Sequence, residues 1–258
     1  MRLQSTPAES TASSSRFALS IASTAEEVRE VQRLRYQVFI ESAGLTSLVN
    51  AERLDRDAFD DYCDHLIVRD SNTLKVVGTY RVLSPHAARR VGRYYSEQEF
   101  DLSRLDNLRS GMAEAGRACI DPDYRSGAVI MLLWAGLAAY MKKENCDYLI
   151  GCASISLADG GQNAAALYYE LADANLAPPE YHVRPRLPFP IDEIASHQQL
   201  PQVHVPPLIR GYMRGGAWVC GEPAWDPDFN CADLFLLLPL ARLDGRLARH
   251  YFKEAQSQ

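Results

Sequence analysis

The sequence predicts one α/β domain built on a mixed sheet, and three observations lead to that expectation. A strand, a long helix and a second strand follow one another over 111–153, an order that favours parallel pairing of the two strands. A β-hairpin signal precedes this run, and two strand-like segments follow it near the carboxyl end. The chain has 258 residues, 47% of them apolar, which suffices for one sizeable core.

The amino-terminal part is expected to contain a disordered tail and one helix. Residues 1–15 are rich in Ser, Thr and Ala and contain no apolar segment of the kind found in signal peptides. We therefore expect a tail over 1–18 and a single domain over 19–258. Thr24 and Glu27 match the capping-box pattern, which predicts a helix from there to about Phe39.

An acidic loop follows this helix, and then a hairpin and a polar region. Two β-rich segments, 65–69 and 74–83, are separated by the turn signal at 70–73, so we expect an antiparallel hairpin. Pro85 ends the hairpin. The polar region from there to about residue 110 is expected to contain short helices.

The second half of the chain alternates strands with helices. Strands are expected over 111–120, 148–153, 217–220 and 232–238. Helices are expected over 128–143, 162–175 and 207–215.

Composition excludes several classes of function. A net charge of −6 argues against a nucleic-acid partner. The longest apolar run, 128–141, is shorter than the roughly 20 residues that a membrane-spanning helix needs. The six cysteines show no CxxC pair or zinc-finger spacing, and none of the six histidines has a neighbour that suggests ligation. We expect no metal, reduced thiols and a cytoplasmic protein.

The segment 113–128 carries the strongest chemical signal in the chain. A strand ends there in a polar turn before a helix, and the free N–H groups of a first helical turn form an anion site. A carboxylate beside such a site can take a proton from an amine that attacks an acyl group carried on a phosphate-bearing arm. We therefore expect an N-acyltransferase in which Glu114 serves as general base or holds the substrate ammonium.

Glu114 and Arg117 are three residues apart, and this spacing makes a specific structural demand. On a regular strand the two side chains point to opposite faces, so a shared site requires a bulge or a bend. The functional interpretation gives Arg117 the task of supporting the acidic loop. The alternative is a structural salt bridge between the two residues.

Arg81 and the acidic loop are a second candidate set. An arginine among apolar strand residues needs a carboxylate partner, which Asp61, Asp64 or Glu114 could supply, unless Arg81 faces solvent on an edge strand. Asp61 and Asp64, with Asp57 and Asp60 nearby, could attract a cationic amino acid. The alternative is a solvated acidic loop.

Several short motifs resemble a known family. Arg35-Tyr36-Gln37-Val38-Phe39, Asp61-Tyr62-Cys63-Asp64, Gly78-Thr79-Tyr80-Arg81 and Glu114-Ala115-Gly116-Arg117 occur in the order seen in acyl-homoserine-lactone (autoinducer) synthases of the GNAT superfamily. The strings at 119–127, 133–137 and 148–154 resemble more closely the bacterial L-ornithine Nα-acyltransferases, which make lyso-ornithine lipid. The resemblance covers roughly residues 34–238. Leu45 stands where autoinducer synthases carry a tryptophan, which favours ornithine over S-adenosylmethionine as acceptor.

The resemblance implies a fold, a reaction and a set of site residues. The fold would be a GNAT-like mixed central sheet flanked by helices. A (3-hydroxy)acyl group would pass from the phosphopantetheine of acyl carrier protein, with no bound cofactor, to the α-amine of L-ornithine in the first step of ornithine lipid synthesis. Glu114 would be catalytic. The implied substrate-binding residues are Arg35, Phe39, Asp61, Asp64, Arg81 and Arg117, and Arg125, Ser126 and Gly127 would bind the phosphopantetheine phosphate.

Partners and rival functions follow from the same resemblance. Arginine clusters at 81–93, 104–109 and 242–249 would offer acidic acyl carrier protein a docking face, or are ordinary surface charge. A lipid product is compatible with peripheral contact with the inner membrane surface. The rivals are an acetyl- or acyl-CoA-dependent GNAT enzyme acting on another amine, an acyl-homoserine-lactone-synthase-like enzyme, and a non-catalytic module that binds acyl carrier protein or lipid.

Overall fold

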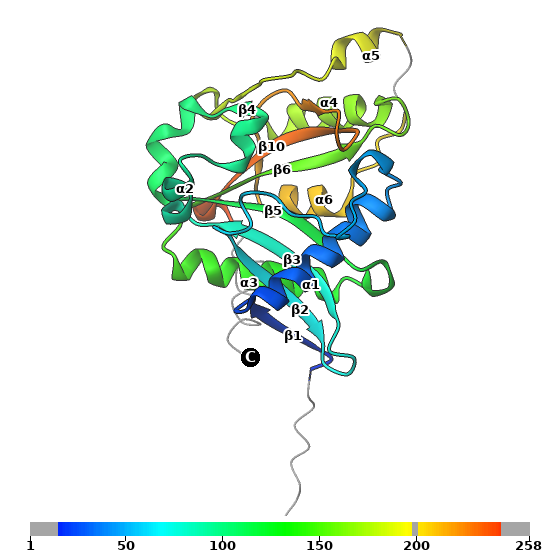
Figure 1. Cartoon of the computed structure of the whole chain (residues 1–258). Helices are drawn as coiled ribbons and strands as arrows, with labels where there is room; N and C mark the ends of the chain where they lie inside the picture. Colours follow the sequence, from blue (N-terminus) through cyan, green and yellow to red (C-terminus); the bar gives the residue numbers. More distant parts are fainter. Residues whose placement is uncertain (1–14, 198–200, 244–258) are drawn as a thin grey trace, which may run out of the picture.

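The computed structural model describes residues 15–197 and 201–243, and their strands form one large mixed sheet (Figure 1). The order in the sheet is β1-β2-β3-β5-β6-β10-β8, with β9 beside β10. The strands are β1 (Phe17–Ile21), β2 (Asp64–Asp70), β3 (Val76–Leu83), β5 (Met112–Ile120), β6 (Tyr148–Ser156), β8 (Trp218–Val219), β9 (Ala224–Asp226) and β10 (Cys231–Pro239). A separate small sheet pairs β4 (Phe100–Asp101) with β7 (Arg184–Pro185).

Helices cover both faces of the sheet. They are α1 (Ala25–Tyr36), α2 (Pro85–Val91), α3 (Ala128–Lys143), α4 (Gln162–Asn175), α5 (Ile191–His197) and α6 (Pro207–Arg214). Short helical turns include a π-turn, η1 (Gln37–Glu41), and the 3-10 helices η2 (Thr46–Leu48), η3 (Tyr95–Gln98), η4 (Ser103–Gly111), η5 (Pro122–Tyr124), η6 (Pro179–Tyr181) and η7 (Leu240–Arg242). Within the described ranges, no helix is both long and apolar enough to cross a bilayer.

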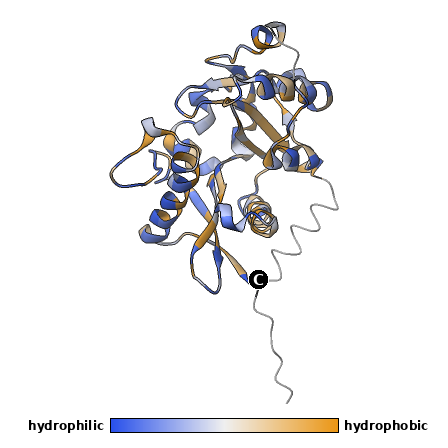
Figure 2. Cartoon of the chain, turned by 90° about the vertical axis from the view of Figure 1, so that its right-hand side faces the viewer, coloured by the Kyte–Doolittle hydropathy of each residue, from blue (hydrophilic) through white to orange (hydrophobic). Residues whose placement is uncertain are grey.

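Alternation along the strands explains why the helices occupy opposite faces. On β2, Leu66 and Val68 pack in the core that contains α3, whereas Ile67 packs against Val31 and Leu34 of α1. Figure 2 shows apolar residues along the central strands and on α3, which is seen end-on, while the other helices carry both hydrophilic and apolar residues. The expected mixed α/β sheet flanked by helices is confirmed.

Most predicted elements are present, with three differences. Thr24 and Glu27 form the predicted capping box, but the α-helix ends at Tyr36 and continues as the π-turn η1. Strand β1, which pairs with β2, contains residues 17 and 18 of the expected tail, while residues 1–14 lie outside the described residues. Strands β4, β7 and β9 and helix α5, each only a few residues long, were not predicted.

The sheet opens between β5 and β6, and this opening positions the site. The two strands pair in parallel only from Met112 to Glu114, opposite 148–150. Beyond that point β5 stays with β3 and β6 stays with β10, so the two strands diverge (Figure 1). Gly151 stands at the point of divergence, where a Cβ atom would lie 2.3 Å from the carbonyl oxygen of Ala115. Only glycine fits this close approach of two backbones.

Candidate active site

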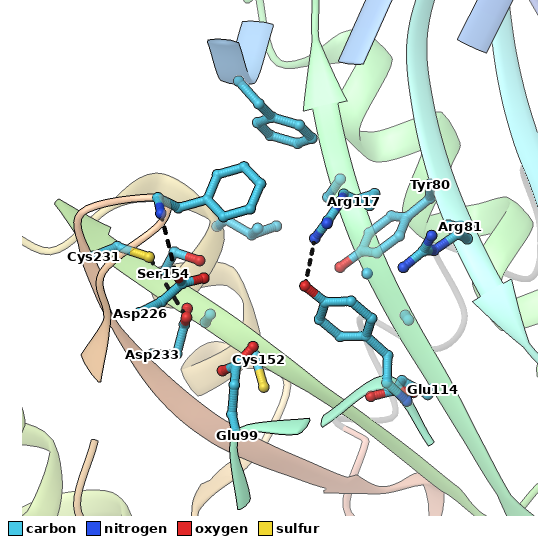
Figure 3. A pocket seen from close by; sticks show the side chains of 18 of the residues that line it. Tyr80, Arg81, Glu99, Glu114, Arg117, Cys152, Ser154, Asp226, Cys231 and Asp233 are labelled. Carbon is cyan, nitrogen blue, oxygen red and sulfur yellow. Dashed lines mark hydrogen bonds between the residues drawn. The ribbon is translucent and has the colours of Figure 1, made fainter. Parts of the chain in front are cut away.

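A cavity of about 390 Å³ opens where β5 and β6 separate (Figure 3). One wall carries arginines from β3 and β5, the facing wall carries carboxylates from β9, β10 and the segment after η3, and apolar side chains complete the lining. A concave site with a few convergent charged groups has the character of a small-molecule site. Glu114, Arg81, Arg117 and Phe39 from the predicted set all line it.

A β-bulge in β5 brings Glu114 and Arg117 to the same cavity. Thr79 of β3 pairs with Cys119, but Arg81 pairs with Gly116, so β5 carries one extra residue between them. Arg117 occupies that position with a φ of 52°, in the left-handed region. The bulge that the sequence spacing demanded is confirmed.

Arg35 is the centre of a buried ionic network behind the cavity. Its Nε donates to Asp55 Oδ2 at 2.6 Å and its Nη1 donates to Asp60 Oδ1 at 2.9 Å. The Arg35 side chain is 0% exposed and does not line the cavity. The structure therefore gives it no direct contact with a substrate in the cavity, contrary to the expected substrate-binding role. Burial opposes the ionisation of Asp60, but Arg35 and Arg81 outweigh it and hold the pKa of Asp60 far below its usual value.

The same network fixes Arg81 and Arg117. Arg81 Nη1 donates to Asp57 Oδ1 at 2.7 Å and to Asp60 Oδ1 at 2.8 Å. Arg117 Nε lies 3.3 Å from Asp55 Oδ2, and its Nη1 donates to the Tyr95 hydroxyl at 3.2 Å. Three arginines therefore face three aspartates, and their charges balance.

The acidic loop takes part through different residues from those predicted. Asp61 is exposed, and Asp64 accepts a 2.6 Å hydrogen bond from the Tyr140 hydroxyl, so neither reaches the network or the cavity. The sequence prediction named Asp61 and Asp64, whereas the structure brings Asp57 and Asp60, which have the same three-residue spacing, to the network. A loop carries no periodic signal from which to tell which acids turn inward.

Glu114 is buried and holds the start of η3. It accepts hydrogen bonds from the backbone N–H of Tyr95 at 2.5 Å and of Ser96 at 2.8 Å, and a short one from the Ser96 hydroxyl. Burial raises the pKa of the Glu114 carboxyl, and the bonds from Ser96 and Tyr95 oppose that rise. A carboxyl whose pKa is displaced toward neutrality suits exchange of a proton with an amine.

The facing wall contains carboxylates that sequence reasoning missed. Glu99 follows η3, Asp226 ends β9 and Asp233 lies on β10 (Figure 3). Burial raises the pKa of Glu99, and the charges of Asp233 and Asp226 raise it further; burial likewise raises the pKa of Asp233. The sequence did contain one signal for this wall. Asp233 is the single charged residue in the apolar run 232–238, and a charged residue in a buried strand indicates a functional or paired position.

Comparison with known proteins assigns the chain to a family. The acetyltransferase (GNAT) domain family matches residues 34–135. An L-ornithine N(alpha)-acyltransferase of Brucella abortus is 32% identical over 254 residues, covering 91% of this chain and 88% of the relative. An L-ornithine N(alpha)-acyltransferase of Rhodobacter capsulatus is 33% identical over 256 residues, which cover 94% of this chain and 97% of the relative. The chain belongs to the L-ornithine N(alpha)-acyltransferase family. It is an N-acyltransferase, as the sequence predicted.

Solved structures of autoinducer synthases share the fold of this acyltransferase. The CoA-dependent acyl-homoserine lactone synthase BjaI superposes with a TM-score of 0.52 at 13% identity, covering 90% of this chain and 83% of that one. MesI, another CoA-dependent synthase, gives a TM-score of 0.51 at 12% identity and covers 92% and 95%. At this identity the likeness concerns the fold alone, and it confirms the GNAT-like architecture.

The turn predicted to bind phosphopantetheine lies outside the cavity lining of the acyltransferase. Arg125, Ser126 and Gly127 are exposed between β5 and α3, and Gly127 precedes the helix with a φ of 93°. Arg125 Nε donates to the carbonyl oxygen of Ile120 at 3.4 Å. Their contact with phosphate stays a prediction.

Two further sets of groups bear on the chemistry of the acyltransferase. Burial raises the pKa of the Cys152 thiol well above its ordinary value, so this cavity cysteine is not a ready thiolate nucleophile. Donor atoms of Asp226, Cys231 and Asp233 lie within 4.8 Å of one another. The expectation that no metal binds is therefore open to direct measurement.

Proposed function

We propose that this chain transfers an acyl group from the phosphopantetheine arm of acyl carrier protein to the α-amine of L-ornithine, giving lyso-ornithine lipid. The observation that carries the proposal is the cavity between β5 and β6, which places Glu114 opposite a wall of carboxylates. Identity of 32–34% to four L-ornithine N(alpha)-acyltransferases, over 91–94% of this chain, supports the choice of substrate.

The charge of the cavity supports a cationic acceptor. The arginine wall is neutralised by its own aspartates, as the network shows. The carboxyl groups of the facing wall have no basic side chain of the described chain as partner, so a cation that enters the cavity can pair with them. An amino acid with a cationic side chain complements such a cavity better than a neutral one does.

The proposed reaction uses Glu114 as the proton acceptor. Glu114, directly or through a water molecule, takes a proton from the α-ammonium of ornithine, and the free amine attacks the thioester carbonyl carbon. A C–N bond forms, the C–S bond breaks, and the phosphopantetheine sulfur leaves and takes up a proton. Backbone N–H groups where β5 and β6 diverge would stabilise the oxyanion of the tetrahedral intermediate.

The acyl donor would approach through the apolar part of the cavity. Val38, Phe39 and Leu45 line it near the π-turn, and Leu208 and Phe229 line it from the other side. Such a lining suits a fatty acyl chain. The phosphate of the arm would meet the turn at Arg125, Ser126 and Gly127, next to the amino terminus of α3.

Exposed arginines support an acidic carrier protein as donor. Arg89 and Arg90 on α2, with Arg93 just after it, are exposed, and within the described chain no carboxylate lies within 4.0 Å of their guanidinium groups. Arg93 lies over the ring of Phe59, a residue of the cavity lining, at 5.6 Å. Arg81 is buried and Arg109 is paired with Glu97, so only part of the predicted clusters is available for docking.

A defined reconstitution tests the proposed function. The purified chain is mixed with L-ornithine and either 3-hydroxyacyl-acyl carrier protein or the matching acyl-CoA, and the products are identified by mass spectrometry. We expect a monoacylated ornithine from the carrier protein, and none with the Glu114→Ala variant. A product formed only from acyl-CoA, or only with another amine, would overturn the proposal.

The lipid nature of the product leads us to propose action in the cytoplasm at the inner surface of the membrane. The support is chemical, because an acylated amino acid partitions into a bilayer. Fractionation of expressing cells, with and without active carrier protein, measures how much of the chain sediments with membranes.

A further inference from the structure

We propose that Asp233, with Asp226 and Glu99, binds the side-chain ammonium of the acceptor and thereby selects a diamino acid. The inference rests on the proposed function and adds the residues that set acceptor specificity. It also assigns the two ends of the substrate: the side-chain ammonium to the carboxylate wall and the α-amine to the Glu114 wall.

The three carboxylates converge from different parts of the fold. Asp233 projects from β10 and Asp226 from the neighbouring strand β9, while Glu99 follows η3 and lies next to Asp233 (Figure 3). Strand β9 is short but fixed by its pairing, with Asp226 opposite Cys231 and Ala224 opposite Asp233. The acidic wall is thus built on paired strands and not on a loose surface loop.

Two of these carboxylates have an oxygen that nothing in the described chain satisfies. Asp233 is 3% exposed, yet its Oδ1 has no hydrogen-bond partner among the described residues. Its Oδ2 accepts a weak bond from Cys231 Sγ at 3.5 Å, and the side chains of Ser154 and Glu99 also interact with this carboxyl. Glu99 Oε2 is likewise buried without a described partner. Buried polar groups are normally paired, so these oxygens point to a ligand that donates hydrogen bonds.

The missing partner should be a cation. No Lys or Arg of the described chain lies within 4.0 Å of these three carboxylates, whereas every arginine of the facing wall has an aspartate. An unpaired buried carboxylate is costly, and an ammonium group with three N–H donors would satisfy several oxygens at once. The raised pKa values of Glu99 and Asp233 agree with carboxyls that lack a counter-ion.

The cavity connects this wall to the proposed reaction centre. Cys152 stands beside Glu99 and contacts the Ser96 hydroxyl at 3.3 Å, and Ser96 in turn holds Glu114. A substrate with its side-chain ammonium on Asp233 would therefore direct its other end toward the wall that carries Glu114 (Figure 3).

The test compares two acceptors that differ only in the side-chain amine. L-Ornithine and L-norvaline share a carbon skeleton, and kcat/KM is measured for each with wild type and with Asp233→Asn. We expect the variant to lose about 10- to 100-fold with ornithine and to keep the low wild-type value with norvaline. If kcat/KM falls equally with both acceptors, Asp233 acts on the α-amine. If kcat/KM for ornithine does not change, the carboxylate wall has no role in acceptor binding. Either result would overturn the inference.

Binding measurements keep the inference testable without turnover. Calorimetric titration of ornithine and norvaline into wild type and Asp233→Asn should show that the substitution raises the Kd for ornithine and leaves that for norvaline unchanged. If wild type binds ornithine but does not acylate it, the proposed function fails while this inference stands. Ornithine binding unaffected by Asp233→Asn would defeat the inference while leaving the function intact.

Controls separate the ammonium from a metal and from a folding defect. Asp106→Asn removes an exposed carboxylate paired with Arg109 on η4 and should leave both acceptors unchanged. Glu99→Gln provides a second variant, with the same selective loss for ornithine. Stoichiometric binding of Mn²⁺ that Asp233→Asn abolishes, together with loss of activity in EDTA, would show that the wall holds a metal and would overturn the inference.

Discussion

Glu114 and Arg117 line the same cavity although they are three positions apart on one strand. The extra residue in β5 and the left-handed φ of 52° at Arg117 make this possible. A non-glycine residue in that region carries a conformational cost, which the surrounding ion pairs and the ring of Tyr95, 4.9 Å from the guanidinium, offset. The bulge thus turns a carboxyl and a guanidinium into the same cavity, where a regular strand would point them to opposite faces.

Replacing Glu114 by Gln should remove the proton acceptor while keeping one amide oxygen as an acceptor at the start of η3, where the wild-type carboxylate accepts with both oxygens. We expect kcat to fall about 100-fold or more. In the wild type, activity should rise with pH through the raised pKa of Glu114, because the ionised form accepts the proton. A pH profile of kcat/KM checks this. If the residual activity of Glu114→Gln still rises with pH over the same range, the rise belongs to the titration of another group.

Ser96→Ala should move that limb without abolishing activity. The Ser96 hydroxyl bonds to Glu114 and lowers its pKa, so its removal raises the pKa further. We expect the rising limb of the profile to shift to higher pH, with a plateau close to that of wild type. A shift to lower pH would contradict the assignment of this limb to Glu114.

Arg35→Met should destabilise the fold strongly, because Asp55 and Asp60 would lose their buried partner. Breaking a buried pair by removing one side costs about 3–5 kcal/mol. Urea unfolding gives the change in the free energy of unfolding. The matched control is Arg33→Met on the same helix, where the pair with Glu26 is exposed and screened by solvent and should contribute little. Equal losses of unfolding free energy in the two variants would show that the buried network around Arg35 does not stabilise the fold more than an exposed pair does.

Stability should fall in acid because of Asp60. Its pKa is lower in the folded chain than the value of about 3.9 in the unfolded chain, so the unfolded state binds a proton first as pH falls. The stabilisation is complete above about pH 5 and is lost progressively below about pH 4. Urea unfolding between neutral and acid pH measures this slope. Asp60→Asn should be less stable at neutral pH and show a shallower slope.

Asp57→Asn and Asp61→Asn should differ although both residues lie in the acidic loop. Asp57 pairs with Arg81 and Arg117, so its loss should cost about 1–3 kcal/mol and reduce kcat/KM. Asp61 is exposed, and we expect a change within about 0.5 kcal/mol and normal activity. Chemical denaturation and steady-state assays of both variants check the choice of pair.

Gly151→Ala should disturb the divergence of β5 and β6. A Cβ atom there would lie 2.3 Å from the carbonyl oxygen of Ala115, and overpacking of this kind costs about 1–3 kcal/mol. Gly116→Ala on the opposing strand is the control, since no atom lies within 4 Å of its added Cβ. Thermal unfolding compares the two. A Gly151→Ala variant as stable as Gly116→Ala would mean that the strands can separate further at no cost.

Local sequence signals predicted the long elements well. The bounds 128–143 and 162–175 coincide with α3 and α4, because both helices bury an apolar face and begin after a glycine. The capping box at Thr24 and the hairpin of β2 and β3 follow from side-chain and turn chemistry that acts within a few residues. Strands β4, β7 and β9 escaped prediction because each is defined only by its pairing with another strand.

The sequence by itself determined the family, the mixed sheet and the identity of Glu114, Arg81, Arg117 and Phe39 as residues of one cavity. Those features rest on local patterns and on motifs in a fixed order. The tertiary structure decided which acids turn inward: Asp55, Asp57 and Asp60 in place of Asp61 and Asp64, and the separate wall of Glu99, Asp226 and Asp233. A carboxylate turns inward when a cation, hydrogen-bond donors or a ligand compensate its desolvation, and those partners lie far away in the sequence.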